Sequence, residues 1–318
     1  MTTVFPALIR ELRTGRSAML AAIVSHEGSS PREAGSMMLV GSSGRLAGTI
    51  GGGAVEQNAQ AEAQRLLASG TSGTHEYCLH QNRREDIGMV CGGSVTVFFQ
   101  HFSAQEASLR LAEAVLRRIE TGRPGYMVLG GDLPTLSDGS VPPQGTAIPL
   151  PTLYRAILFG GGHIALALAP LLNSVGFRVT VFDDRAEFSG PARFPMAETI
   201  HGDYERIGDY LTLEPEDYVV VVTEGHRHDF AVERQALGHE LAYIGAIGSK
   251  TKTAAVNQRL LDCGFTQADL ERLHAPIGLP IKSATPEEIA VSIAAEMILV
   301  RAERRERDSG APCPMAEG

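Results

Sequence analysis

The first third of the chain alternates short apolar runs with helical patterns. The predicted strands lie at residues 18–25, 36–40, 46–50, 77–79 and 94–100. The predicted helices lie at residues 6–14, 54–67 and 105–120. Short turns rich in serine and glycine connect neighbouring strands, which is typical of antiparallel pairing. The pattern therefore predicts an α+β domain of mostly antiparallel character.

From residue 155 the pattern changes to strands that alternate with helices. The predicted strands lie at residues 156–159, 178–182, 199–200, 218–223 and 242–247. The predicted helices lie at residues 164–175, 235–240, 251–263, 267–273 and 286–304. Continuous apolar runs such as 219–222 indicate strands buried on both faces. We expect an α/β protein in which a C-terminal Rossmann-type, doubly wound parallel sheet follows an N-terminal α+β domain.

The segment between these two patterns is rich in proline and glycine and shows no hydrophobic period. Such composition is typical of turns and linkers. We therefore predict three parts: an α+β domain at residues 1–125, a linker at 126–151, and a Rossmann-type domain with a C-terminal helix at 152–318.

A glycine-rich turn, Gly160-Gly161-Gly162-His163, follows the strand at 156–159 and opens a helix. Glycines in this position permit a tight turn and let the backbone approach a diphosphate. The N-terminus of the following helix offers unpaired N–H groups to an anion. The turn therefore predicts a phosphate or dinucleotide site, although a glycine turn that binds nothing stays open as an alternative.

An acidic pair, Asp183-Asp184, follows the next strand, about 20 residues beyond the turn. An acid in this place is typical of a contact with ribose hydroxyls, and it disfavours a 2′-phosphate. Any dinucleotide would therefore be of the NAD type. Fold alone does not decide the ligand, and any pyrophosphate would satisfy the same turn.

Two later strands end in polar residues. The run His226-Arg227-His228-Asp229 follows the strand at 218–223, and we interpret it as a ligand-contacting loop, a metal site or a solvated loop. Ser249 and Lys250 follow the next strand and begin a helix. Lys250 could meet an anion or lie on the surface. No residue here stands out as the proton donor that a dehydrogenase needs, so the sequence assigns no catalytic residue.

The first domain holds three further candidates. Gly51-Gly52-Gly53 follows a strand and opens a helix, with Glu56 on its first turn, so it predicts a second anion cradle. Arg32, in a loop with serines and a proline, offers a forked cation to phosphate or carboxylate. Cys91 precedes Gly92 and a second glycine, which would leave an accessible thiol with backbone donors nearby. Each candidate has a structural alternative. The glycine run could be only a tight connection between strand and helix, Arg32 could be a solvated surface residue, and Cys91 could be a small apolar residue of the core.

Composition narrows the class of protein. The net charge of −9 argues against a general nucleic-acid binder. No apolar run is long enough to span a membrane, and the N-terminal residues lack the apolar stretch of a signal peptide. The four cysteines are widely spaced, which is typical of free thiols in a reducing compartment. We therefore expect a cytoplasmic protein with no nucleic-acid or membrane partner.

Taken together, the motifs resemble the xanthine dehydrogenase accessory family, XdhC/CoxI, over nearly the whole chain. The matching stretches, all in the family's order, are Gly28-Ser29-Ser30-Pro31-Arg32, Gly48-Thr49-Ile50-Gly51-Gly52-Gly53, Cys91-Gly92-Gly93, Gly160-Gly161-Gly162-His163-Ile164-Ala165, Phe182-Asp183-Asp184-Arg185, Ala242 through Lys250, His274-Ala275-Pro276-Ile277-Gly278 and Thr285-Pro286-Glu287-Glu288. The resemblance implies an assembly factor rather than an enzyme that turns over substrate. Such proteins look like carriers of molybdenum cofactor, a pterin dithiolene with a terminal phosphate that is often extended to a dinucleotide.

The resemblance also implies partners. A cysteine desulfurase would supply the terminal sulfur, and a molybdenum hydroxylase of the xanthine dehydrogenase type would receive the cofactor. Cys91 would be the contact to molybdenum or sulfur. Two other functions stay open: an NAD-dependent oxidoreductase, and an interaction scaffold with an empty Rossmann fold. The apolar helix near residues 289–300 needs burial, which a homodimer or the monomer itself would provide.

Overall fold

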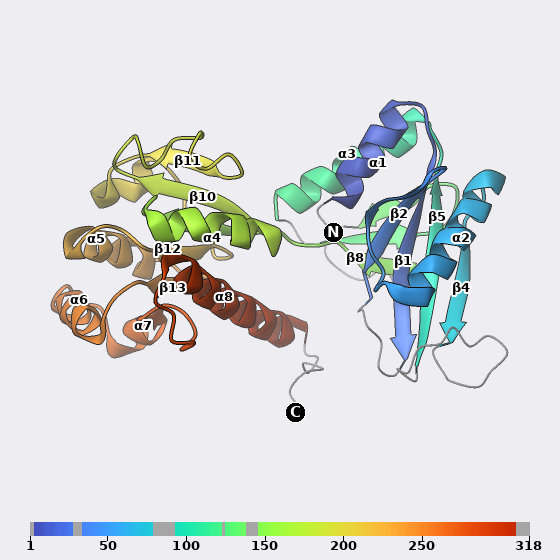
Figure 1. Cartoon of the computed structure of the whole chain (residues 1–318). Coiled ribbons are helices and arrows are strands. Elements are labelled where there is room, and N and C mark those ends of the chain that lie inside the picture. The colour runs from blue at the N-terminus through green and yellow to red at the C-terminus, as the bar shows by residue number, and fades with distance from the viewer. Residues whose placement is uncertain (1–2, 28–33, 79–92, 123–124, 138–145, 310–318) are drawn as a thin grey trace. The chain divides into compact units, whose positions relative to one another are not determined.

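The chain folds into two compact units, Met1–Leu153 and Tyr154–Gly318. The computed structural model describes residues 3–27, 34–78, 93–122, 125–137 and 146–309. Figure 1 shows the helices and strands of both units. Each unit is built around its own main sheet.

A five-stranded antiparallel sheet forms the centre of the first unit, in the order β3-β2-β1-β5-β4. Its strands are β1 (Ala18–Glu27), β2 (Met37–Gly41), β3 (Gly44–Gly48), β4 (Gly73–Cys78) and β5 (Ser94–Phe102). Its helices are α1 (Val4–Arg13), α2 (Gly53–Ser69) and α3 (Glu106–Glu120). The N-terminal α+β prediction is confirmed.

Alternation along β1 explains why helices cover both faces of this sheet. Leu20 and Ala22 pack with α1 and α3, whereas Met19, Ala21 and Ile23 pack with α2. Because side chains of a strand alternate between faces, an apolar run without polar interruptions places a core on each side. Figure 1 shows α1 beside α3 on one face and α2 on the other.

The segment expected to be a linker contains a small sheet of its own. Strands β6 (Tyr126–Leu129), β7 (Thr135–Ser137) and β8 (Thr146–Pro149) pair antiparallel in the order β7-β6-β8. Met127 and Ile148 are fully buried in the core that also holds α1 and α3. The density of proline and glycine hides these strands, because each is only three or four residues long. The segment is therefore part of the first unit.

The second unit has a six-stranded parallel sheet in the order β11-β10-β9-β12-β13-β14. Its strands are β9 (Tyr154–Phe159), β10 (Phe177–Asp183), β11 (Glu198–His201), β12 (Tyr218–Val221), β13 (Tyr243–Ala246) and β14 (Leu273–His274). Its helices are α4 (His163–Ser174), the 3-10 helix η1 (Tyr204–Asp209), α5 (His226–Leu237), α6 (Lys250–Asp262), α7 (Gln267–Glu271) and α8 (Pro286–Ser309). The order is that of a dinucleotide-binding Rossmann sheet, so the predicted fold is confirmed.

Two apolar layers enclose this sheet. Leu158 and Val220 face α4 and α8, and Phe159 and Val221 face η1, α5 and α6. In Figure 1, α4 and α8 lie next to each other, and their contact is among the most extensive between helices. The strand order changes direction between β9 and β12, which creates a crevice at the carboxyl ends of these two strands.

One predicted boundary is wrong. The expected helix at 235–240 is the end of a longer helix, α5, which already begins at His226. Gly225, with φ of 93°, makes the turn that starts it. The polar residues 226–229 therefore lie on the first helical turn and not in a loop. None of the helices within the described residues is both long and apolar enough to cross a membrane.

Candidate cofactor-binding site

The glycine turn lies at the crevice between β9 and β12, and each glycine has a different environment. A Cβ on Gly160, which has φ of 109°, would overlap the carbonyl oxygen of Val222. A Cβ on Gly161 would overlap the carbonyl oxygen of Phe188. A Cβ on Gly162 would meet no atom within 4 Å in the part of the chain that the structure describes. The first two glycines are thus required by packing, and the third faces open space.

Helix α4 begins beside this open position. Gly162 is its N-cap, no side-chain hydrogen bond caps it, and His163 is exposed. The first N–H groups of a helix have no partner inside the helix and carry a partial positive charge. The end of α4 can therefore accept a phosphate, with contacts from the backbone of Gly162 and His163.

Asp183 does not face this open space. Its carboxylate is fully buried and accepts hydrogen bonds from the Gly161 N–H at 2.7 Å and from Arg185, whose N–H and Nε lie at 2.9 and 3.0 Å. Burial by itself would raise the pKa of Asp183, but the hydrogen bonds from Arg185 and Gly161 lower it overall. The sequence suggested that Asp183 contacts a ribose. In the structure its carboxylate instead holds the glycine turn in place.

Arg185 and the residue before it line a small cavity beyond the carboxyl ends of β10 and β12. The cavity has a volume of about 200 Å³ and is lined by Asp184, Arg185, Tyr204, Glu224 and His228. Arg185 spans it by pairing with both Asp183 and Glu224. The Asp184 side chain is one-third exposed. Of the predicted acidic pair, only Asp184 is open to a ligand.

A buried charged cluster lies behind the start of α5, and the sequence did not reveal it. The Asp229 carboxylate is fully buried, accepts a hydrogen bond from the Thr223 hydroxyl at 2.5 Å, and pairs with the Lys252 ammonium. Glu233, one turn further along α5, is only 3% exposed. Burial raises its pKa to about 8, helped by the negative charge of Asp229 and opposed by Lys252.

The lysine of this cluster is not the one that the sequence suggested as a contact to an anion, Lys250. Lys252, not Lys250, makes the buried ion pair, while Ser249 caps α6 by accepting from the Lys252 N–H at 3.2 Å, and Ser249 and Lys250 are exposed. The signal for the cluster was the i, i+4 spacing of two acids, Asp229 and Glu233, on one helix face. No group of three histidine, cysteine, aspartate or glutamate side chains within the described residues is placed to hold a metal ion.

The glycine loop of the first unit already holds an anion, the carboxylate of Glu56. This carboxylate accepts hydrogen bonds from the N–H groups of Ile50 and Gly52, both at 3.1 Å, and from the Thr49 hydroxyl, and it pairs with Arg45 at 2.6 Å. Burial opposes ionisation, but these hydrogen bonds lower the pKa of Glu56 overall. Gly51, Gly52 and Gly53 all have positive φ, so the loop needs glycine.

The sequence suggested that this loop and Glu56 contact a bound ligand. In the structure the Glu56 carboxylate itself occupies the N–H groups of the loop. A Cβ on Gly52 would meet no atom of the described residues within 4 Å. Three other predicted contacts, Arg32, Cys91 and Gly92, lie outside the described residues.

The fold and the glycine turn define a two-unit α/β protein whose second unit is of the Rossmann type. Residues 156–297 match the XdhC Rossmann domain, and residues 11–78 match the XdhC and CoxI family. The chain therefore belongs to the XdhC and CoxI family, as the resemblance of its motifs predicted.

Named relatives are similar over most of the chain. It is 29% identical, over 91% of its length, to a probable xanthine dehydrogenase subunit of Bacillus subtilis (strain 168), and the match covers 95% of that protein. It is 24% identical, over 98% of its length, to the molybdenum cofactor insertion chaperone PaoD of Escherichia coli (strain K12), covering 91% of that protein. It is 26% identical to the uncharacterized protein YqeB of the same strain, over 89% of its length, but spans only 43% of YqeB.

A crystal structure has the same architecture. It is described as that of a xanthine dehydrogenase from Bacillus halodurans, with 25% identity and a TM-score of 0.76. The similarity covers 93% of this chain and 95% of the other.

Proposed function

We propose that this protein binds molybdenum cofactor and inserts it into a molybdenum hydroxylase of the xanthine dehydrogenase type. The observation that carries the proposal is the similarity to PaoD, a molybdenum cofactor insertion chaperone, over 98% of this chain. The similarity to a protein named as a probable part of xanthine dehydrogenase supports the same client class. The protein would act as a carrier, so its site needs to bind and release a cofactor and needs no catalytic acid.

The phosphate end of the cofactor fits the start of α4. Gly162 has no side chain and borders open space, and the backbone N–H groups of Gly162 and His163 would hold the phosphate. If the pterin carries a nucleotide, Asp184 in the small cavity would accept hydrogen bonds from its ribose. Ser249 and Lys250, exposed at the start of α6, are proposed as further contacts in this unit.

The first unit would hold the metal end of the cofactor. We assign Cys91 as the contact to molybdenum or to its terminal sulfur, with Gly92 and Arg32 as neighbouring contacts. The loop Gly51–Gly53, shaped by Glu56, would present the open position of Gly52 to the ligand. When bound, molybdenum cofactor would supply the metal chemistry of the client, and the chain's residues would only bind, shield and release it.

We also propose two partners and a cellular location for the protein. A cysteine desulfurase would provide the terminal sulfur while the cofactor is bound, and the complex would form in the cytoplasm. A homodimer would cover the half-exposed side chains of Val291 and Leu299 on α8.

The proposal is tested by placing an acid at the phosphate position. Aspartate at Gly162 meets no clash and would cap α4, so Gly162→Asp should fold at least as stably as the parent. Its carboxylate would nevertheless repel and displace a phosphate. Gly208→Asp is a matched control, because that glycine is exposed and also borders open space.

The measurement is hydroxylase activity in cells that lack the parent gene and carry one of the variants. We expect Gly162→Asp to lose hydroxylase activation and Gly208→Asp to keep it, with equal amounts of client protein. Full activation by Gly162→Asp would overturn the assignment of the phosphate site. Full activity in cells with no copy of the gene would overturn the insertion function.

A further inference from the structure

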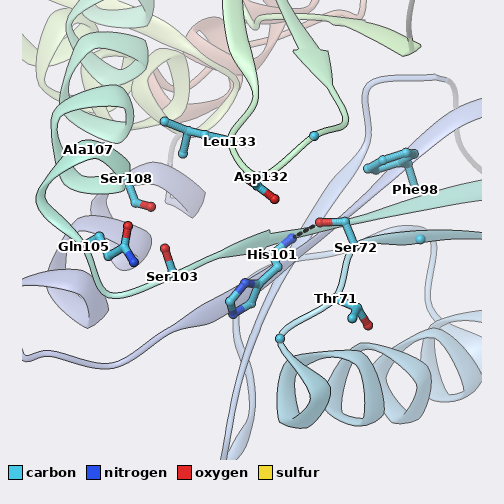
Figure 2. Close-up of a pocket in the computed structure, with 13 residues that line it drawn as sticks. Thr71, Ser72, Phe98, His101, Ser103, Gln105, Ala107, Ser108, Asp132 and Leu133 are labelled. Atoms are coloured by element: carbon cyan, nitrogen blue, oxygen red, sulfur yellow. Dashed lines mark hydrogen bonds between the residues drawn. The ribbon is translucent and has the colours of Figure 1, made fainter.

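A second cavity lies in the first unit and contains none of the residues assigned above. It has a volume of about 760 Å³, within the range of small-molecule sites. Four segments form its walls: the residues after α2, the end of β5, the first turn of α3 and the turn between β6 and β7. Figure 2 shows these segments converging on one hollow.

One buried side chain of β5 connects three of these walls: β5 itself, the residues after α2 and the turn between β6 and β7. Gln100 is fully buried; its amide oxygen accepts from the Gly130 N–H at 2.8 Å, and its amide nitrogen lies 3.3 Å from the Ser72 hydroxyl and 3.4 Å from the Gly131 carbonyl oxygen. The Ser72 hydroxyl also accepts from the His101 N–H at 3.0 Å. These three walls are therefore positioned by the protein itself, which lowers the ordering cost of binding.

The cavity offers polar groups that have no hydrogen-bond partner among the described residues. Ser108 is only 2% exposed, its hydroxyl makes no hydrogen bond with any described residue, and it points into the hollow. Its oxygen is not one of the buried side-chain atoms left without a partner among the described residues, so it is open to the cavity and can bond a ligand there. Ser103 and Asp132 point into the same space from different walls (Figure 2). Helix α3 begins here after Gln105, with no side-chain hydrogen bond at its N-cap.

The charge of the lining argues against phosphate, the ligand most often bound at a helix N-terminus. No arginine or lysine lies among the described residues that line the cavity, and Asp132 carries a negative charge. Burial lowers the pKa of His101, so this imidazole is neutral at pH 7. A phosphate would meet a carboxylate without a compensating cation. A neutral ligand with several hydroxyls suits the same groups, because hydroxyls both donate to Asp132 and accept from N–H groups.

We propose that this cavity binds a neutral sugar, either a free monosaccharide or the ribose of a nucleoside. Asp132 accepts hydrogen bonds from two adjacent hydroxyls, and Ser108 completes its hydrogen bonding with a third polar atom of the ligand. Phe98 and Leu133 cover the apolar face of the ring. The inference goes beyond cofactor insertion and does not depend on it.

The test is saturation-transfer NMR on the full-length protein with three probes: ribose, adenosine and 2′,3′-dideoxyadenosine, which lacks the two adjacent hydroxyls. We expect saturable binding of ribose if the site takes free sugars, and of adenosine alone if it takes nucleosides. The dideoxy compound should bind roughly tenfold more weakly or not at all, because each hydrogen bond to a charged group is lost. Inorganic phosphate should not compete.

Variants place the binding in this cavity. Asp132→Asn and Ser108→Ala should each weaken binding, the former by about tenfold. Asp262→Asn, at an exposed position on α6, is the control and should bind like the parent. Thermal unfolding of each variant verifies the fold. Absence of binding to both ribose and adenosine, competition by phosphate, or equal binding by Asp132→Asn would each overturn the proposal.

Discussion

Glu233 allows a quantitative test of the buried charges behind the cofactor crevice. Its carboxyl group is 3% exposed and one helical turn from the buried Asp229, whose charge Lys252 balances. A second negative charge would have no cation of its own, so the native protein keeps Glu233 protonated and its pKa rises from 4.5 to about 8. Glu233→Gln replaces the protonated acid with a neutral group of similar shape.

The sign of the effect follows from proton uptake on folding. Between the unfolded pKa of 4.5 and the native value of about 8, the native state binds a proton that the unfolded chain has released. The free energy of unfolding therefore falls as pH rises through this window. At pH 7, about 2.5 pH units above the unfolded value, the loss is about 3 kcal/mol. Glutamine removes this loss, so Glu233→Gln should be about 3 kcal/mol more stable than the parent at pH 7.

The assay is urea unfolding followed by far-UV circular dichroism at pH 5, 7 and 9, because the chain has no tryptophan. We expect the stability difference between Glu233→Gln and the parent to be below about 1 kcal/mol at pH 5, to grow to pH 7 and to level off above pH 8. Glu240→Gln, with a side chain 88% exposed, is the control and should follow the parent at every pH. A difference that is the same at all three pH values would refute the reasoning.

Three further predictions concern the glycine turns and Cys91. Gly161→Ala should lose about 1–3 kcal/mol of stability in urea unfolding, because its Cβ overlaps the Phe188 carbonyl, whereas Gly162→Ala should stay within about 0.5 kcal/mol of the parent; equal losses would contradict the geometry. Glu56→Gln should lose about 1–3 kcal/mol at pH 7. Because the pKa of Glu56 is lowered, this loss should shrink as pH falls below 4.5, and a constant loss would argue against the charged cradle. Cys91→Ser should lower hydroxylase activation in cells by about tenfold or more, and full activation would remove Cys91 from the site.

Periodicity was sufficient to predict both architectures. The alternating strands and helices after residue 155 predicted the parallel sheet, and the helix-opening glycine turn predicted where the crevice lies. The strands β6, β7 and β8 were missed because short strands with proline at their ends carry almost no periodic signal. The early start of α5 was missed because its first turn is polar.

The site was harder to predict, because sequence shows which residues carry charge but not what satisfies it. Asp183 and Glu56 both have the composition and spacing of ligand contacts. In the structure each accepts backbone N–H groups of its own glycine loop. The pairing of Asp229 with Lys252 joins two helices and two strand ends, so it appears only once the sheet is assembled.

The central claim is tested most directly by the molybdenum and pterin content of the protein purified from a molybdate-replete host. The denatured protein is analysed for oxidised, fluorescent pterin and for molybdenum by elemental analysis. The account predicts near-stoichiometric amounts of both in the parent and in Gly208→Asp, and a loss of both in Gly162→Asp. Absence of pterin and molybdenum from the parent, together with saturable NADH binding in a titration, would contradict it and indicate an oxidoreductase.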